Sequence, residues 1–571
     1  MLETDNNNAG QPAFTDADFS RREDLGPSER WGDRDWWRGA VIYQIYPRSF
    51  RDTSGDGVGD LPGIIEKLDY LASLGVDAIW VSPFFKSPMK DFGYDVSDHR
   101  AVDPIFGQLS DFDRLVAEAQ RRGLKVLIDV VLSHTSDEHP WFRDSRRDRG
   151  NPRADWYVWA DPKPDGTPPN NWLSVFGGAA WTWEPRRGQY YLHHFLAGQP
   201  DLNFHNVEVQ DAILAEVEFW LGRGVDGFRL DAAHAYFHDT DLRDNPALAS
   251  QDDSAIGGAP FNNPHNCQLH VHSMDRPENI AFLKRFRALL DRYPGTTSIA
   301  EINTNDSLAT VAAYTKGGDR LHMGYTFDLL ADDFSATHFR RVVGYLENRI
   351  EDGWPCWAFS NHDVVRAVSR WGGKAADERF AKLLPALLLS LRGSTCLYQG
   401  EELGLPEASL SFEQLQDPYG KAFWPDFSGR DGCRTPMPWT AQARGGFTLG
   451  EPWLPLPAEH LERAVEQQDA DPDSVLNAFR GFLAWRNRHP ALRQGEIRFL
   501  DTDEPLLAFE RRSGDEHLIA VFNLGAEPVM SSLGERAGLR PLSGHGFTAQ
   551  LDEGLLHLPG FGAFFGSVAP R

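Results

Sequence analysis

The chain has 571 residues, of which 41% are hydrophobic, so it is long enough for several structural units around a large core. Its formal net charge of −26 at pH 7 argues against nucleic acid and membrane surfaces as partners, because both attract basic patches. The sequence has no apolar run of about 18 residues, the length of a membrane span, and its start, MLETDNNNAG, lacks the basic and apolar regions of a signal peptide, so we expect a cytoplasmic protein.

From about residue 31, short apolar segments alternate with helical patterns such as IIEKLDYLASLG and VQDAILAEVEFWLGRG. Such alternation predicts a parallel sheet with helices outside it. The expected strands are residues 40–47, 77–83, 124–131, 227–232, 298–302, 324–329, 356–363 and 394–400. Eight strand–helix units predict an α/β protein with a (β/α)8 TIM barrel, whose catalytic groups occupy the C-terminal strand ends.

Long insertions interrupt this alternation, and insertions of that length in a compact unit tend to be functional lids or subdomains. The insertion after the third strand is rich in loop aromatics, as in NNWLSVFGGAAWTWEP, which suit stacking on sugar rings. Near residue 495, alternating strands with a hairpin around SGDE indicate an all-β C-terminal domain. We expect a flexible tail at 1–30, a barrel (domain A) at 31–131 and 202–495, an inserted domain B at 132–201, further inserts at about 233–277 and 405–475, and a β-sandwich (domain C) at 496–571.

Polar residues that suit catalysis gather at the predicted C-terminal strand ends. They are Asp129 near the end of the third strand with His134 just beyond it, Arg229 and Asp231 at the fourth, Glu301 at the fifth, and His362 and Asp363 at the seventh. A lone acid at such a position is more often a helix cap or part of a salt bridge. Several acids at one barrel face are harder to explain in that way, because packed like charges cost stability unless the site uses them.

Three carboxylates beside one arginine suit the cleavage of a glycosidic bond. One carboxylate attacks the anomeric carbon, a protonated second one gives its proton to the leaving oxygen, and a third steadies the developing positive charge. In GVDGFRLDAAH, Arg229 and Asp231 are two residues apart on a strand and therefore point the same way. We therefore expect Asp231 to attack and Arg229 to keep it ionised by lowering its pKa.

Several short motifs together carry a resemblance to a known family. They are DVVLSH (129–134), QPDLNF (199–204), GFRLDAAH (227–234), IAEI (299–302) and FSNHD (359–363). Their order resembles that of the α-amylase family of glycoside hydrolases, family 13, and the resemblance extends from about Trp37 to the end of the chain.

The resemblance implies a retaining mechanism for the residues at the motif positions. Asp231 would be the nucleophile, Glu301 the general acid and then the base, and Asp363 the stabiliser of the transition state. The residues expected to contact the sugar or the nucleophile are His134, His362 and Arg229.

The segment DFGYDVSDH (91–99) is similar to a signature of the exo-acting α-glucosidase branch of this family. In that branch Asp91 would bind the far hydroxyls of a terminal glucose, with Arg430 of SGRDGCRTPMPW as its partner, and Tyr94 would stack on the ring. An Asp–Arg pair that closes one end of a pocket makes an enzyme exo-acting, because a longer chain cannot pass through it.

The residue after the proposed nucleophile bears on linkage preference. Within the branch that the sequence resembles, Val at this position accompanies α-1,6 preference, whereas Ala or Thr accompanies α-1,4 or sucrose preference. This sequence has Ala232 there, so we expect maltose-like α-1,4 bonds as substrates, with sucrose as a further candidate.

The acidic loop DTSGDGVGD (52–60) is a candidate metal site. The side chains of Asp52, Ser54, Asp56 and Asp60 and the carbonyl of Val58 offer oxygen ligands, as in an EF-hand loop up to its ninth position. The alternative is an acidic, glycine-rich turn. Members of the α-glucosidase branch bind Ca²⁺ or Mg²⁺ here, so we expect a structural divalent cation, and no cofactor for the chemistry itself.

The expected function is an exo-acting retaining α-glucosidase whose covalent intermediate also passes glucose to sugar or alcohol acceptors. The nearest alternative is a sucrose isomerase or trehalulose-forming enzyme on the same frame. A non-catalytic glycosidase-like subunit is a more distant one, and it is disfavoured because this chain keeps its three acids and has no membrane span. We expect small-molecule α-glucoside substrates and a monomer or homodimer. The four scattered cysteines are expected to be reduced thiols.

Overall fold

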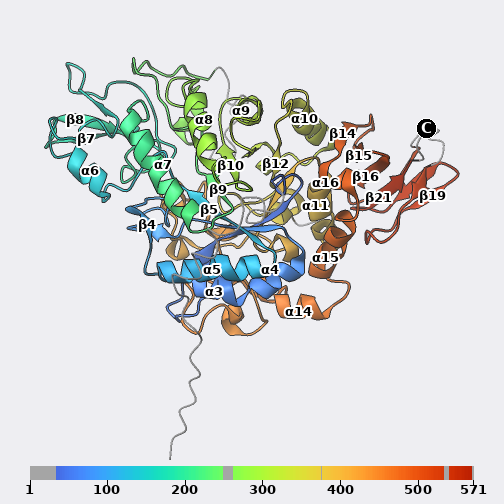
Figure 1. The fold of residues 1–571 in the computed structure, drawn as a ribbon. Coiled ribbons are helices and arrows are strands. Elements are labelled where there is room, and N and C mark those ends of the chain that lie inside the picture. The colour runs from blue at the N-terminus through green and yellow to red at the C-terminus, as the bar shows by residue number, and fades with distance from the viewer. Residues whose placement is uncertain (1–33, 249–261, 374–375, 533–538, 569–571) are drawn as a thin grey trace, which may run out of the picture.

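The computed structural model describes residues 34–248, 262–373, 376–532 and 539–568, and a closed barrel of parallel strands lies at its centre (Figure 1). The barrel strands are β1 (Val41–Ile45), β2 (Ala78–Val81), β5 (Lys125–Val130), β9 (Gly227–Leu230), β10 (Thr297–Ile302), β11 (Met323–Thr326), β12 (Cys356–Trp357) and β13 (Ser394–Tyr398). They pair in the order β11-β10-β9-β5-β2-β1-β13-β12. A parallel bridge between Gly324 and Pro355 joins the two outer strands. The expected (β/α)8 architecture is therefore confirmed.

The interior of the barrel is filled by apolar side chains from alternate positions of its strands. Ile42, Trp80, Leu127, Ile299 and Tyr325 belong to one buried cluster there. Inward and outward positions alternate along a strand, so these residues face the barrel axis while their neighbours face the helices. The barrel is thus a packed core, and in this fold the catalytic groups are expected at its C-terminal end.

The seventh strand is shorter than the expected range of 356–363. β12 ends at Trp357, and the residues after it run as a loop. There the Asn361 side-chain oxygen accepts a hydrogen bond from the backbone N–H of Asp363 at 2.8 Å. An asparagine that bonds its own backbone two residues on forms a turn, which takes the chain out of the strand and directs Asp363 to the end of the barrel.

Helices cover the outside of the barrel. They include α3 (Leu61–Glu66), α4 (Leu68–Leu74), α5 (Leu109–Arg121), α7 (Val207–Gly222), α8 (Asn279–Leu290), α9 (Ser307–Thr315), α10 (Ala336–Glu347) and α11 (Glu378–Ser390). Polar side chains mark where several of them begin: Asn206 caps α7, Ser335 caps α10 and Asp377 caps α11 by accepting hydrogen bonds from free backbone N–H groups.

The insertion after β5 carries a small sheet of its own. α6 (Pro140–Ser145) precedes the strands β6 (Trp159–Ala160), β7 (Trp181–Glu184) and β8 (Gln189–Leu192), which pair antiparallel in the order β6-β8-β7. The expected tail at 1–30 lies outside the described residues, as does the stretch 249–261 of the insert expected at 233–277.

The C-terminal part of the chain is built from antiparallel sheets and lies on the opposite side of the barrel from β7 and β8 (Figure 1). Its strands are β14 (Glu496–Phe499), β15 (Leu506–Ser513), β16 (Glu516–Asn523), β17 (Val529–Ser532), β18 (Arg540–Pro541), β19 (Gln550–Asp552), β20 (Leu555–Leu558) and β21 (Ala563–Ser567). β15 and β16 form the hairpin expected around SGDE, with Ser513 opposite Glu516. Within the described ranges, no helix combines the length and apolar character needed to span a bilayer.

Candidate active site

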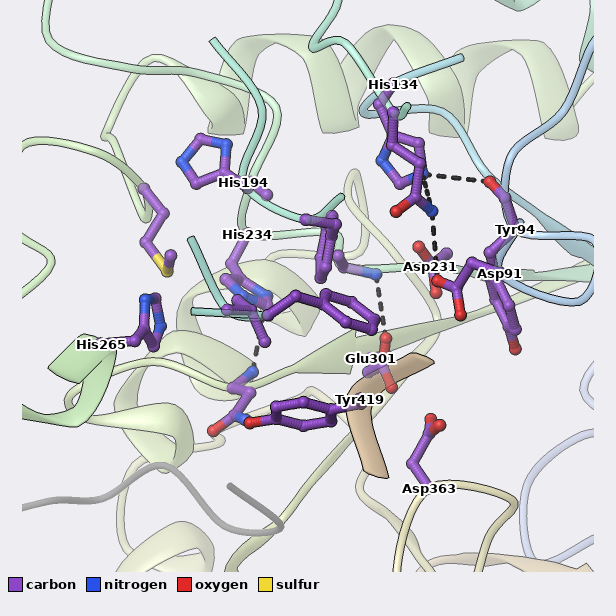
Figure 2. A pocket seen from close by; sticks show the side chains of 18 of the residues that line it. Asp91, Tyr94, His134, His194, Asp231, His234, His265, Glu301, Asp363 and Tyr419 are labelled. Atoms are coloured by element: carbon purple, nitrogen blue, oxygen red, sulfur yellow. Dashed lines mark hydrogen bonds between the residues drawn. The ribbon is translucent and has the colours of Figure 1, made fainter. Parts of the chain in front are cut away.

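A cavity of about 140 Å³ opens at the C-terminal end of the barrel. Asp231, Glu301 and Asp363 point into it from the ends of β9, β10 and the loop after β12 (Figure 2). The other expected site residues that line it are Asp91, Tyr94, His134, Ala232 and Arg430. Arg229 and His362 are fully buried beside it. The structure therefore brings together, around one cavity, residues that the sequence spreads over more than 300 positions (339 between Asp91 and Arg430).

Arg229 contacts more acids than the sequence indicated. Its Nη1 donates to Oδ1 of Asp231 at 2.6 Å and to Oδ1 of Asp129 at 2.9 Å. Its Nη2 lies 2.6 Å from Oε1 of Glu301. We expected Arg229 to serve Asp231 alone. The planar guanidinium instead holds both proposed reacting carboxyls in fixed positions.

The proposed nucleophile and acid have similar proton affinities. Burial raises the pKa of Glu301 to about 7, although Arg229 lowers it. Burial also raises the pKa of Asp231 to about 7 against the same arginine. The expected lowering by Arg229 is present but is outweighed, because removal from water disfavours the charged form. Carboxyls that share one arginine titrate as a coupled set, so one can keep its proton near neutral pH while the other is ionised.

Asp363 has a different environment from the other two acids. Its Oδ1 accepts hydrogen bonds from Arg434 Nη2 at 2.8 Å and from Arg430 Nη1 at 3.1 Å. Burial would raise the pKa of Asp363, but these guanidinium groups hold it well below its usual range. Asp363 is therefore an anion at neutral pH. Arg434 was not among the expected site residues, although it stands in the same SGRDGCR segment as Arg430.

A buried ion pair forms part of the cavity wall. Arg430 Nη2 donates to Asp91 Oδ1 at 2.9 Å and to Asp417 Oδ1 at 2.8 Å. Arg430 Nε also bonds Asp417 Oδ2 at 3.1 Å. The predicted Asp91–Arg430 pair is thus present, and Asp417 is an additional anchor for the arginine. Nothing in the sequence around Asp417 had indicated this contact.

His362 holds Tyr94 at the wall of the cavity. Gln44 donates to Nδ1 of His362 at 2.8 Å, so Nε2 carries the proton and donates to the Tyr94 hydroxyl at 2.6 Å. The hydroxyl in turn donates to Asp129 Oδ2 at 3.2 Å. Burial lowers the pKa of His362 to about 3, so the ring is neutral. The rings of His362 and Tyr94 are nearly parallel with centroids 5.5 Å apart, and the hydrogen bond between them fixes the orientation of the Tyr94 ring.

Segments outside the barrel strands complete the cavity wall. Phe176 and Phe195 come from the insertion after β5, and Tyr419 comes from the insert expected at 405–475. His265 and Met274 come from the insert after β9. The sequence marked these segments as functional by their length and loop aromatics, but it did not indicate which of their residues reach the site.

The loop 52–60 offers the expected oxygen ligands but no assembled cage. Asp52 and Asp60 are buried, and neither forms an ion pair within the described ranges. Asp52 accepts hydrogen bonds from the backbone N–H groups of Gly55 and Gly57, both at 2.8 Å, and Asp60 accepts one from Gly63 at 2.7 Å. No group of three or more His, Cys, Asp or Glu in the described part of the chain is arranged to hold a metal ion. The donor chemistry fits a hard cation, and the cation stays a prediction.

The chain is similar to known proteins in both sequence and structure. The family model for the α-amylase catalytic domain matches residues 44–495. A probable α-glucosidase of Rhizobium meliloti (strain 1021) is 57% identical over 540 residues, covering 94% of this chain and 98% of that protein. An oligo-1,6-glucosidase of Heyndrickxia coagulans is 37% identical over 533 residues, covering 87% and 93%. The crystal structure of an α-glucosyl transfer enzyme superposes with a TM-score of 0.92 at 60% identity, covering 93% and 99%.

Proposed function

The chain belongs to the α-amylase family of glycoside hydrolases, family 13, and on that premise we propose that it is an exo-acting, retaining α-glucosidase. It removes the terminal non-reducing glucose of maltose-like disaccharides and short oligosaccharides, with sucrose as a further substrate. It also transfers glucose to sugar or alcohol acceptors. The observation that carries this proposal is the convergence of Asp231, Glu301 and Asp363 on one cavity that is also lined by the Asp91–Arg430 ion pair. In this proposal the pair forms the closed end of the glucose site.

The closed end supports binding of a terminal glucose. Asp91 and Arg430 present charged hydrogen-bonding groups that suit the hydroxyls at the far side of the ring. Tyr94 lines the cavity with its ring oriented by His362, and it offers an aromatic face for stacking on the sugar. Because the ion pair blocks that end, the scissile bond lies one glucose unit from it.

The environments of the three acids support a double displacement. Glu301, whose pKa burial raises to about 7, holds the proton that passes to the leaving oxygen. Asp231, held by Arg229, attacks the anomeric carbon and forms the glycosyl–enzyme bond as the leaving bond breaks. Ionised Asp363 stabilises the positive charge that develops on the sugar.

The second half of the reaction explains both hydrolysis and transfer. Glu301, now a carboxylate, takes a proton from water or from an acceptor hydroxyl, and that oxygen attacks the anomeric carbon and releases Asp231. Two inversions retain the α configuration. Any acceptor that reaches the cavity mouth competes with water, so transfer products accompany hydrolysis.

Incubation of the purified chain with maltose, isomaltose, sucrose and trehalose, with identification of every product, tests this proposal. We expect free glucose and transfer products from maltose, both absent in Asp231→Asn. Conversion of sucrose mainly into an isomeric disaccharide would establish the sucrose-isomerase alternative. Failure to release glucose from any of these sugars would overturn the proposal.

Metal binding, location and assembly are further proposals. We propose that the 52–60 loop takes Ca²⁺ or Mg²⁺ with a structural role, held by Asp52, Ser54, Asp56, Asp60 and the Val58 carbonyl, which would neutralise the two buried carboxylates. The support is the oxygen donor set and the absence of an ion pair to Asp52 or Asp60 among the residues described.

We also propose a cytoplasmic monomer or homodimer that binds neither nucleic acid nor a membrane, in keeping with the net charge of −26.

A further inference from the structure

Tyr325 lies beside the proposed acid on the adjacent barrel strand. β11 pairs with β10 in a register that sets Tyr325 directly opposite Glu301. Tyr325 is only 1% exposed, and its ring packs 6.3 Å from that of Trp80 inside the barrel. A phenylalanine would fill the same space. The hydroxyl therefore needs an explanation other than packing, because a buried hydroxyl costs free energy unless it is hydrogen-bonded.

The contacts of the hydroxyl fix its direction. Arg229 Nη2 donates to the Tyr325 oxygen at 3.0 Å. The phenol has one hydrogen, and the acceptor that remains within reach is Oε1 of Glu301 at 3.3 Å. Burial also raises the pKa of Tyr325 well above its usual value, so the phenol keeps its proton. Tyr325 is thus an acceptor toward Arg229 and a donor toward Glu301.

The two oxygens of Glu301 consequently have different surroundings. Among the described residues, Oε1 accepts a hydrogen bond from Tyr325 and forms an ion pair with Arg229 Nη2 at 2.6 Å. Oε2 accepts a hydrogen bond from the backbone N–H of Ala232 at 3.0 Å. An acidic hydrogen on Oε1 would compete with the phenol hydrogen that Tyr325 directs at this oxygen and would be repelled by the charge of Arg229, whereas Oε2 has only the Ala232 N–H beside it among the described residues.

We propose that Tyr325 is a positioning residue which, together with Arg229, holds Oε1 of Glu301 as an acceptor and so places the transferable proton on Oε2. This inference rests on the proposed role of Glu301 as general acid and refines it. Without the phenol, Glu301 gains rotational freedom and its proton distributes over both oxygens. Proton transfer to a poor leaving group then becomes less efficient, while binding of glucose at Asp91 and Arg430 is untouched.

The test compares Tyr325→Phe with the wild type on maltose and on p-nitrophenyl α-glucoside. We expect kcat for maltose to fall about five- to tenfold, the size of one lost hydrogen bond, with KM nearly unchanged. The aryl glucoside should lose much less, because its leaving group needs little protonation. A donor to a carboxylate lowers its pKa, so its loss should also move the basic limb of the maltose kcat/KM profile to higher pH.

Tyr398→Phe is the matched control. Tyr398 is another fully buried tyrosine of a barrel strand, and its hydroxyl donates to the carbonyl of Cys433 at 3.0 Å rather than to a reacting group. The Tyr398→Phe variant should be less stable than the wild type, but its ratio of kcat values for the two substrates and its pH profile should not change. The proposal would be overturned if Tyr325→Phe slowed both substrates equally and left the basic limb of the kcat/KM profile in place. Tyr325→Phe would then leave the substrate ratio and the pH profile unchanged, as Tyr398→Phe is expected to do.

A second comparison separates this inference from the proposed function. In a Glu301→Gln background, Tyr325→Phe should have no further effect on the substrate ratio, because the proton it positions is gone. If Glu301→Gln itself left maltose turnover intact, the assigned function would fail. If Glu301→Gln lowers maltose turnover, but adding Tyr325→Phe lowers it further by the same factor as in the wild type, only the positioning role is wrong.

Discussion

Arg430 and Asp91 are 339 positions apart in the chain, yet Nη2 of the one lies 2.9 Å from Oδ1 of the other in a buried ion pair. Asp91 follows β2 in the barrel, whereas Arg430 belongs to the insert that follows β13. Both residues line the cavity. In the proposed function the pair closes the end away from the leaving group, which would restrict cleavage to chain ends.

Asp91→Asn tests the closed end. The variant keeps the shape of the side chain, and Arg430 keeps Asp417 and Asp363 as partners, so the fold should survive. We expect kcat/KM for maltose to fall roughly 30- to 1,000-fold, because a buried charge-assisted contact to the substrate is lost. This corresponds to a loss of about 2–4 kcal/mol in transition-state stabilisation. Asp98→Asn, an exposed acid of the same segment, is the control and should behave as wild type. Early internal fragments from long amylose with the wild type would contradict exo action.

Asp231→Asn tests the nucleophile. Loss of the attacking carboxylate should lower turnover of p-nitrophenyl α-glucoside by about 10³-fold or more. Arg229 would keep Asp129 and Glu301 as partners, so the melting temperature should stay close to that of the wild type. Steady-state kinetics and thermal unfolding measure the two effects. A variant with wild-type turnover would show that another group forms the covalent intermediate.

The pH profile tests the assignment of Glu301. The acid form of Glu301 is needed, and burial raises its pKa to about 7, so kcat/KM for maltose should fall as pH rises above about 7. The ionised form of Asp231 is needed, so activity should also fall as pH drops below about 7. We therefore expect a narrow bell near neutral pH. Glu301→Gln should remove the basic limb and should slow maltose far more than an activated aryl glucoside.

Ala232→Val tests linkage preference. Ala232 has a φ of +40°, and its N–H bonds Oε2 of Glu301 at 3.0 Å. A β-branched side chain is strained at positive φ, so Val should lower activity overall by disturbing Glu301. Beyond that loss, one or two added methyl groups in the cavity can change the preference between two substrates by about 1–3 kcal/mol. Wild type should prefer maltose to isomaltose, and Val should shift the ratio toward isomaltose. An unchanged ratio, or a wild type that prefers isomaltose, contradicts the role of this side chain.

Chelation tests the metal loop. If Asp52 and Asp60 bind Ca²⁺ or Mg²⁺, EDTA should lower the melting temperature and either ion should restore it, since a ligand of the native state stabilises it. Asp56→Ala, which removes an exposed candidate ligand, should abolish the response to added ion. The catalytic rate at low temperature should not change, because the loop is separate from the residues that line the cavity. A melting temperature insensitive to both treatments would show that the hydrogen bonds of Gly55, Gly57 and Gly63 suffice.

The barrel could be read from the sequence because its signals are local. A buried parallel strand such as β5 is a short apolar run, an amphipathic helix such as α5 has its own period, and their alternation limits the topology. The seventh strand was overestimated because FSNHD is apolar at its start, while the turn made by Asn361 is a side-chain hydrogen bond that no apolar pattern reveals.

The sequence by itself indicated which acids meet, because residues at the C-terminal ends of parallel strands share one end of the barrel, and strand order brings Asp231 and Glu301 together. Asp363 lies beyond the end of β12 and reaches the same cavity through the turn made by Asn361. Only the tertiary structure decided how they are held. The sharing of Arg229 between Asp231 and Glu301, the anchoring of Arg430 by Asp417 and the hydrogen bond from Tyr325 are contacts of a few ångströms between distant segments. Such contacts depend on strand register and loop paths, and burial in the assembled cavity sets the pKa values, so no local pattern of residues encodes them.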